Sequence, residues 1–378
     1  MPTVVVAGAG MAGLVAAAEA RRLGASALVL EKLPRAGGSM LLSSGVVWRH
    51  RDFETFRAEC PEGDERLQRR VFERLDADLD WLESLGAPVV ERATGNPLTT
   101  GTRFDPEGMT AALVEAAGGL RRNSHGAGRA GSGSVQLDDP LGEAPGSLPL
   151  ILATGGFGAS RDLLRAHVSR EAEHAFLRAA PGSTGDGLRI GLEAGGRTSA
   201  GLDQVYARAM PAPPARIGER DLARLAQLYA RHADVTNERG ERYETRTWSE
   251  TDVAQWQLMQ PRARAWFTVA AERLGERVRE RTVGEMVDAA EAAGAPVARG
   301  LNGAPVRSGD DDVTVETVAG VTTTLGGLAI DEHGHVADNV YACGADAGGI
   351  ATGGYASGLA AALVFGRVAA RAALGEHP

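Results

Sequence analysis

Residues 3–13 read Thr-Val-Val-Val-Ala-Gly-Ala-Gly-Met-Ala-Gly, and this stretch decides the fold. A short β-branched run, typical of a strand, passes directly into glycines and then into an alanine-rich segment that favours a helix. Gly8 permits a tight turn, Gly10 lets a pyrophosphate approach the backbone, and Gly13 lets the helix pack on the strand. The free amides and positive dipole at the helix start attract phosphate.

The next apolar run supports the same interpretation. Residues 26–30 are predicted as a second strand, and Glu31 follows them directly. An acid at the end of this strand is placed to accept hydrogen bonds from a ribose diol. Strand, glycine turn, helix, strand and acid therefore predict a βαβ unit that binds a dinucleotide.

Composition limits the remaining possibilities. The chain has 378 residues, which suits two domains better than one. With 40 basic and 49 acidic residues, the formal charge of -9 argues against a surface that binds nucleic acid. There are too few cysteines for a disulfide framework, the N-terminal apolar run is a strand rather than a secretion signal, and no segment approaches the roughly 18 apolar residues of a membrane span. We expect a cytoplasmic protein.

The distribution of glycine divides the chain into two parts. Glycine-rich turns recur in residues 1–200 and 324–378, whereas residues 201–323 contain more Trp, Tyr and Arg and no glycine fingerprint. We expect an α/β fold in which the outer segments form a Rossmann-like dinucleotide-binding domain, with residues 201–323 inserted as an α+β domain. Apolar spacing predicts helices over residues 64–85, 106–117 and 359–374, strands over 147–153, 328–330 and 340–343, and a shortened hairpin region or a flexible loop over 121–146.

Several glycine turns, each at a strand end, indicate one long cofactor lying along the carboxyl edge of a parallel sheet. A flavin dinucleotide needs such a series of turns. The chain resembles flavoproteins of the fumarate reductase, succinate dehydrogenase and 3-ketosteroid dehydrogenase type, which have a glutathione-reductase-like FAD-binding domain and an inserted capping domain for the substrate. The resemblance covers nearly the whole chain and rests on residues 8–13, 31–39, 152–157, 184–187, 237–243, 324–327, 341–344 and 353–367.

The resemblance implies a set of FAD-binding residues. These are Gly8, Gly10, Ala12 and Gly13 at the pyrophosphate, Glu31 at the adenosine ribose with Lys32 after it, Gly38 and Ser39 toward the ribityl side, Ala153, Thr154 and Gly155 along the adenosine half, Gly344 and Asp346 after a later strand, and Ser357 and Leu359 at the pyrimidine edge. Asp186 either binds the cofactor or caps a helix. Met40 stands where some members carry a histidine bonded to the flavin, so we expect non-covalent FAD.

The residues that bind dicarboxylates in fumarate reductases are missing. Arg208 and Thr323 stand at the two histidine positions, and Glu250 and Gly353 at the two arginine positions, with Glu250 expected as a solvated charge. These mismatches argue against fumarate as the substrate. What remains resembles the ketone-directed branch, which uses tyrosines and backbone amides.

Three residues are candidates for catalysis. Tyr355 lies in a turn that the resemblance places near the flavin, where it stabilises an enolate or simply packs. Arg208 lowers the pKa of that phenol or binds a substrate carboxylate, and Tyr206 and Arg208 are either ligands or domain-interface residues.

We therefore predict a non-covalent FAD oxidoreductase that acts on CH–CH bonds. It transfers hydride between flavin N5 and a carbon next to a carbonyl, with a ketone, cyclic ones included, as the favoured substrate of a dehydrogenase. One alternative is a reductase of an unsaturated carboxylate, in which Arg208 or Arg246 replaces the missing arginine; another is a flavin-binding protein that has lost catalysis. We expect no metal site, and a separate electron donor or acceptor.

Overall fold

The computed structural model describes residues 3–122, 125–129, 135–138, 148–300 and 311–376. The chain divides into two compact units. The first consists of Met1–Ser160, Ala179–Gln204 and Thr323–Pro378, and the second of Arg161–Arg178 and Val205–Thr322.

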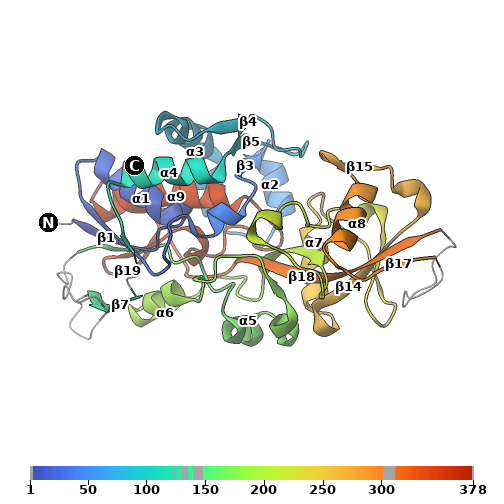
Figure 1. The fold of residues 1–378 in the computed structure, drawn as a ribbon. Helices are drawn as coiled ribbons and strands as arrows, with labels where there is room; N and C mark the ends of the chain where they lie inside the picture. The colour runs from blue at the N-terminus through green and yellow to red at the C-terminus, as the bar shows by residue number, and fades with distance from the viewer. Residues whose placement is uncertain (1–2, 123–124, 130–134, 139–147, 301–310, 377–378) are drawn as a thin grey trace. The chain divides into compact units, whose positions relative to one another are not determined.

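A six-stranded sheet forms the centre of the first unit (Figure 1). Its strand order is β19-β20-β9-β1-β2-β6, parallel throughout except for β19 (His335–Ala337). The parallel strands are β1 (Val4–Ala7), β2 (Ala27–Glu31), β6 (Arg121–Arg122), β9 (Leu150–Leu152) and β20 (Val340–Ala342). β1 lies between β2 and β9 and is buried along its whole length, as a central parallel strand requires. The carboxyl ends of these three strands therefore meet at one edge.

Helices of the first unit pack against one another beside this sheet. α1 (Met11–Arg22) contacts α4 (Pro106–Ala117) and α9 (Gly358–Ala373), and α9 also contacts α3 (Glu65–Ser84) (Figure 1). α3 and α4 begin at aspartates, Asp64 and Asp105, whose side chains accept hydrogen bonds from amides of the first turn. The unit also contains α2 (Phe53–Glu59) and α6 (Asp186–Glu193).

A buried ion cluster joins three of these helices. Arg367 of α9 donates to Glu19 of α1, with 3.2 Å between Nε and Oε2, and also to Asp78 of α3. Glu19 is fully buried. Because one arginine bonds to carboxylates on two other helices, these bonds hold the three helices in one arrangement.

Two antiparallel sheets complete the first unit. The larger has the order β3-β5-β4, with β3 (Val46–His50), β4 (Val89–Glu91) and β5 (Thr99–Phe104). The smaller pairs β7 (His125–Arg129) with β8 (Val135–Asp138).

The second unit is built on a seven-stranded sheet with the order β10-β18-β14-β12-β13, to which β11 and β17 add by pairing with β18. Its strands are β10 (Phe176–Leu177), β11 (Val205–Pro211), β12 (Asp234–Thr236), β13 (Arg242–Tyr243), β14 (Arg264–Val269), β17 (Val297–Arg299) and β18 (Val313–Thr324). The core of the unit includes Tyr229, whose ring meets Phe267 edge-on at 5.7 Å. Helices α5 (Arg161–His167), α7 (Thr251–Leu258) and α8 (Val283–Ala292) and the hairpin of β15 (Arg277–Val278) and β16 (Arg281–Thr282) also belong to it.

Most predicted elements are confirmed. The α/β fold is present, and the three helices appear as α3, α4 and α9. The strand over 328–330 is wrong: only Leu328 forms isolated bridges, with Thr198 on one side and Ala347 on the other. The chain turns immediately afterwards, at Asp331, whose side chain accepts from the amide of His333. The segment is therefore too short to form continuous strand pairing.

Two further expectations concern residues 121–146 and residues 161–178. Within 121–146, the β7–β8 pair fits the hairpin alternative, while residues 123–124, 130–134 and 139–146, together with residue 147 of the predicted strand, lie outside the described residues. Residues 161–178, expected with the dinucleotide-binding domain, group with the second unit because β10 pairs with β18 there. In the described part of the chain, no helix has the length and apolar character needed to cross a membrane.

Candidate functional site

The turn between β1 and α1 can be built only from glycine at two positions. Gly8 has a φ of +107°, and a Cβ there would lie 2.2 Å from the carbonyl oxygen of Ala153. A Cβ on Gly13 would lie 1.9 Å from the carbonyl oxygen of Gly8. These close approaches bring the start of α1 against the ends of β1 and β9.

Gly10 differs from its neighbours because the space in front of it is open. It begins α1, no side chain caps its helix, and a Cβ added there would meet nothing within 4 Å. The amides of the first turn therefore face space that a phosphate can fill.

Glu31 ends β2 with its carboxylate oriented by the backbone. Oε2 accepts from the amide of Ala9 at 2.7 Å, and Oε1 accepts from the amide of Leu33 at 2.8 Å. Each oxygen keeps a second lone pair, so the carboxylate can still accept bonds from ribose hydroxyls.

Lys32 and Asp186 form an ion pair. Lys32 Nζ lies 2.6 Å from Asp186 Oδ2 and 2.7 Å from Thr184 Oγ1. Asp186 is the first residue of α6, and the N-cap position is occupied by Gly185. Asp186 is therefore not the N-cap residue of this helix, and its binding to the cofactor stays a prediction. Lys32 instead joins the end of β2 to the loop that opens α6.

Asp346 holds the turn that follows β9. Its buried carboxylate accepts from the amide and the hydroxyl of Thr154 and from the amide of Gly156, the last at 2.9 Å. The Thr154 hydroxyl in turn accepts from the amide of Gly187 in α6. Burial raises the pKa of the Asp346 carboxyl despite these bonds. Asp346 thus fixes three backbone segments relative to one another.

The remaining expected FAD residues lie in the first unit. Gly37 forms a bridge with Gly10 next to Gly38, and Ser39 Oγ accepts from the amide of Ala180 at 2.9 Å. A Cβ on Gly344 would come within 2.8 Å of Ala12, which explains the small residues at both positions. Met40, the position linked to covalent attachment, is buried.

The start of α9 is capped and its amides are ordered. Ser357 Oγ accepts from the amide of Ala360 at 3.2 Å, and Leu359 lies in this first turn. Nearby, the ring of Tyr355 packs edge-on against Trp48 at 5.8 Å.

Unpaired hydroxyls give an independent test of whether FAD suits the first unit. Thr324 and Thr352 are buried, yet neither Oγ1 has a hydrogen-bond partner in the described structure. Thr324 Oγ1 lies 2.5 Å from the place a Cβ of Gly156 would take, so it borders the turn that follows β9. Buried orphan hydroxyls beside glycine turns and an open helix start are features that a polar dinucleotide would satisfy. The residues present fit the cofactor.

The second unit contains a phenol in a cationic setting. Tyr206 and Arg208 point to the same face of β11, and Arg208 Nε donates to the Tyr206 hydroxyl at 2.8 Å. Arg208 Nη1 donates to the carbonyl oxygen of Ser249. Burial alone would raise the pKa of Tyr206, but the charges of Arg208, Arg178 and Arg279 outweigh it and lower the pKa.

Two of these arginines were not identified from the sequence. Arg178 follows β10 and donates to Thr322 Oγ1 at 2.9 Å, while Arg279 lies in the turn between β15 and β16. Neither belongs to a motif, so only the tertiary fold reveals them.

Glu250 is not the solvated charge that was expected. It is buried, accepts from the amide of Ala230 at 2.9 Å, and pairs with Arg231 at 3.3 Å. Its position before α7, at a φ of +57°, turns the carboxylate inward.

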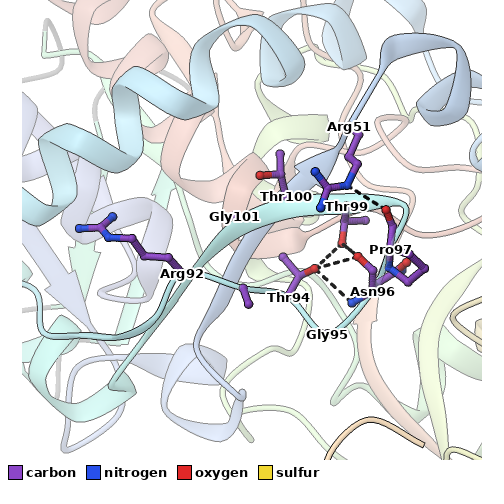
Figure 2. A pocket seen from close by; sticks show the side chains of 10 residues that line it. Arg51, Arg92, Thr94, Gly95, Asn96, Pro97, Thr99, Thr100 and Gly101 are labelled. Atoms are coloured by element: carbon purple, nitrogen blue, oxygen red, sulfur yellow. Dashed lines mark hydrogen bonds between the residues drawn. The ribbon is translucent and has the colours of Figure 1, made fainter.

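A cavity of about 280 Å³ lies in the first unit, at the loop between β4 and β5 (Figure 2). Arg51 borders it and donates to the carbonyl oxygen of Pro97 (Figure 2). Arg92, also at this cavity, is paired with Glu83. No residue expected to bind FAD or to act in catalysis lines it. Among the described residues, no group of three or more His, Cys, Asp or Glu is arranged to hold a metal ion.

Comparison with known proteins identifies the family. Residues 3–134 and 148–359 match the profile of the FAD binding domain family, and the chain belongs to this family. It is an FAD-dependent oxidoreductase. A sequence search of curated proteins finds no match.

Solved structures share the fold over nearly the whole chain. A flavocytochrome c3 fumarate reductase in an open conformation has a TM-score of 0.71 at 21% identity, over 99% of this chain and 78% of that one. A 3-ketosteroid Δ4-(5α)-dehydrogenase from Rhodococcus jostii RHA1 scores 0.70 at 19% identity, over 98% and 96%. A 3-ketosteroid Δ1-dehydrogenase from Sterolibacterium denitrificans scores 0.75 at 14% identity, over 99% of both chains. The fold expected from the resemblance is confirmed.

Proposed function

We propose that this chain is a dehydrogenase that oxidises the C–C bond next to the carbonyl of a ketone, with FAD bound non-covalently in the first unit. The observation that carries the proposal is the Tyr206–Arg208 pair. Arg208 can only donate, so the Tyr206 oxygen is the acceptor of their 2.8 Å hydrogen bond. A phenol held in this way by a cation loses its proton more readily than an ordinary tyrosine.

FAD, when bound, supplies the two-electron oxidation by accepting a hydride from the carbon β to the carbonyl. Tyr206, as the phenolate, removes the proton from the carbon α to the carbonyl. Arg208 holds the phenolate oxygen and stabilises its charge between turnovers. Tyr355 remains proposed as the donor to the ketone oxygen, with its ring fixed against Trp48.

The electron balance of the reaction requires an electron acceptor besides the substrate and the flavin. The substrate loses a hydride and a proton, so two electrons must leave the protein before the next turnover. We propose that a separate electron acceptor takes them. The two ketosteroid dehydrogenases with this fold were solved with steroid diones, which agrees with a ketone as the substrate class.

The structure weakens the alternative in which Arg208 binds the carboxylate of an unsaturated acid. Two of its donor atoms are engaged, Nε by Tyr206 and Nη1 by Ser249. Arg246, the other candidate, lies with its guanidinium 6.0 Å from the ring centre of Tyr243. We therefore favour proton transfer by Tyr206 over anion binding by Arg208.

Replacement of Tyr206 tests the proposal. In anaerobic rapid mixing with a panel of cyclic and open-chain ketones, a substrate should bleach the oxidised flavin. Tyr206→Phe should slow this bleaching by about 10² to 10⁴-fold. Tyr229→Phe is the matched control, because Tyr229 is also buried in the second unit but has no partner for its hydroxyl in the described structure. Bleaching at the wild-type rate by Tyr206→Phe would remove Tyr206 from the mechanism.

A further inference from the structure

Glu250 has a backbone conformation that a residue with a side chain rarely adopts. It precedes α7 at a φ of +57°, in the left-handed region that favours glycine. The φ of a residue sets the orientation of the peptide before it, here the peptide whose carbonyl belongs to Ser249. An ordinary φ of about −60° would rotate this carbonyl by roughly 120°. The conformation of Glu250 therefore decides where the Ser249 carbonyl points.

The side chain of Glu250 holds this conformation in place. Although Glu250 occupies the N-cap position of α7, its carboxylate makes no capping bond. The side chain is buried and bonds to another segment instead. Oε2 accepts from the amide of Ala230 at 2.9 Å, and Oε1 accepts from the amide and the Nε of Arg231 at 3.2 and 3.3 Å. A strained backbone persists where its surroundings fix it in several ways, and such strain is concentrated at functional sites.

The Ser249 carbonyl connects Glu250 with the proposed base. Arg208 Nη1 donates to this carbonyl, and Nε of the same guanidinium donates to the Tyr206 hydroxyl at 2.8 Å. Because a guanidinium is planar and rigid, a bond at Nη1 restricts the direction in which Nε points. Residues 230–231 are therefore linked to the Tyr206–Arg208 pair through Glu250 and Ser249.

We propose that Glu250 is a positioning residue for proton transfer by Tyr206. By directing the Ser249 carbonyl at Arg208, it keeps the Arg208 guanidinium on the phenol oxygen that takes the proton. Glu250 acts through these two residues and is not itself the base. This inference rests on the proposed function, since it explains how the base of that reaction is held.

The direction of one change distinguishes positioning from a direct effect of charge. Burial raises the pKa of Tyr206, but the charges of Arg208, Arg178 and Arg279 outweigh it, while Glu280 acts on Arg279 and Glu250 pairs with Arg231. Glu250→Gln removes a negative charge, which by electrostatics alone would lower the pKa of the phenol. Loss of positioning raises that pKa instead, because Arg208 then stabilises the phenolate less. We expect the pKa of Tyr206 to rise.

The glutamine weakens the anchor without changing its size. Whichever way its amide is turned, the NH₂ group faces a donor, either the amide of Ala230 or the donors of Arg231. Glu250→Ala removes all three bonds and should move the pKa of Tyr206 in the same direction. Glu316→Gln is the matched control, because Glu316 is another partly buried glutamate of the second unit that pairs with an arginine, Arg264. It should not raise the pKa of Tyr206.

The pKa is measured on the full-length, FAD-loaded protein without substrate. The chain has five tyrosines, so ¹³C labelling of the ring carbon that bears the hydroxyl gives few NMR signals, and Tyr206→Phe identifies the one from Tyr206. Flavin bleaching by the ketone panel is followed separately after anaerobic mixing. Glu250→Gln should slow it by about 10- to 100-fold while the affinity for the ketone is retained.

The outcomes separate this inference from the function on which it rests. A pKa of Tyr206 that falls or stays unchanged in Glu250→Gln overturns the role of Glu250. If bleaching is slowed by Tyr206→Phe but not by Glu250→Gln, the dehydrogenase stands and the role of Glu250 is again overturned. If the pKa rises in Glu250→Gln but no ketone bleaches the wild-type flavin, Glu250 positions the phenol as inferred and ketone dehydrogenation is wrong.

Discussion

Replacing Asp346 by asparagine should destabilise the protein even without its cofactor. In the structure the carboxylate accepts three hydrogen bonds, two at Oδ1 and one at Oδ2. An asparagine can place its oxygen at the Oδ1 position, but its NH₂ group then faces the amide of Thr154, donor against donor. This contact leaves a buried amide unpaired, which costs about 1–3 kcal/mol, and relief from burying a charge offsets only part of it. We expect a net loss of about 2 kcal/mol of unfolding free energy.

The assay is thermal unfolding of the apoprotein together with FAD affinity from flavin fluorescence. A loss of about 2 kcal/mol lowers the midpoint of unfolding by about 2.5 °C in a protein of this size. FAD affinity should fall as well, because the Thr154–Gly156 turn is displaced, and the same energy corresponds to roughly 30-fold. A variant whose apoprotein unfolds like the wild type but binds FAD weakly would refute this reasoning. That result would make Asp346 a direct ligand of the cofactor.

Two further predictions concern acid stability and the glycine turn. Burial raises the pKa of Glu19, but hydrogen bonds and charges from Arg22 and Arg367 outweigh it and hold the pKa at about 2. The resulting stabilisation of about 3 kcal/mol is present above the ordinary pKa of a glutamate and is lost as the pH falls from about 4.5 toward 2. Glu19→Gln should therefore reduce the loss of unfolding free energy over this acidic pH range, measured by unfolding at a series of pH values. An unchanged pH dependence in the variant would contradict this prediction. Gly13→Ala should destabilise the apoprotein by about 1–3 kcal/mol because its Cβ overlaps a carbonyl oxygen, whereas Gly10→Ala should leave the apoprotein unchanged and weaken FAD binding. Equal effects of the two alanines on apoprotein unfolding would rule out this division of roles.

The glycine turn was predictable because its causes are local. Gly8, Gly10 and Gly13 lie within six residues of one another, and each is explained by a contact or an open space at its own position. Glu31 follows from the same βαβ pattern. Helices such as α3 were predictable for the same reason, since apolar spacing and a capping aspartate are both written in the local sequence.

The cationic setting of Tyr206 was not predictable from sequence. Arg178, Arg208 and Arg279 come from three separate segments, namely the end of β10, strand β11 and the turn of the β15–β16 hairpin, and only the tertiary fold of the second unit brings their charges to act on one phenol. The resemblance drew attention to Arg208 but linked it to Tyr355, whereas the phenol whose pKa it lowers is Tyr206. Asp346 shows the same limit, since the amide it holds is 192 residues away. Charges and hydrogen-bond partners that are distant in the sequence produce no periodic pattern in it, so they cannot be predicted from local spacing.

The pH dependence of flavin reduction in the wild type and in Arg208→Gln tests the proposed role of Tyr206 most directly. Tyr206 acts as a base only when it is deprotonated, so the rate should rise with pH through its pKa. The charge of Arg208 lowers that pKa, and its removal should raise it. We predict that the rising limb of the profile moves to higher pH in Arg208→Gln, while Arg273→Gln leaves it in place. A limb at the same pH in the wild type and in Arg208→Gln would contradict proton transfer by Tyr206.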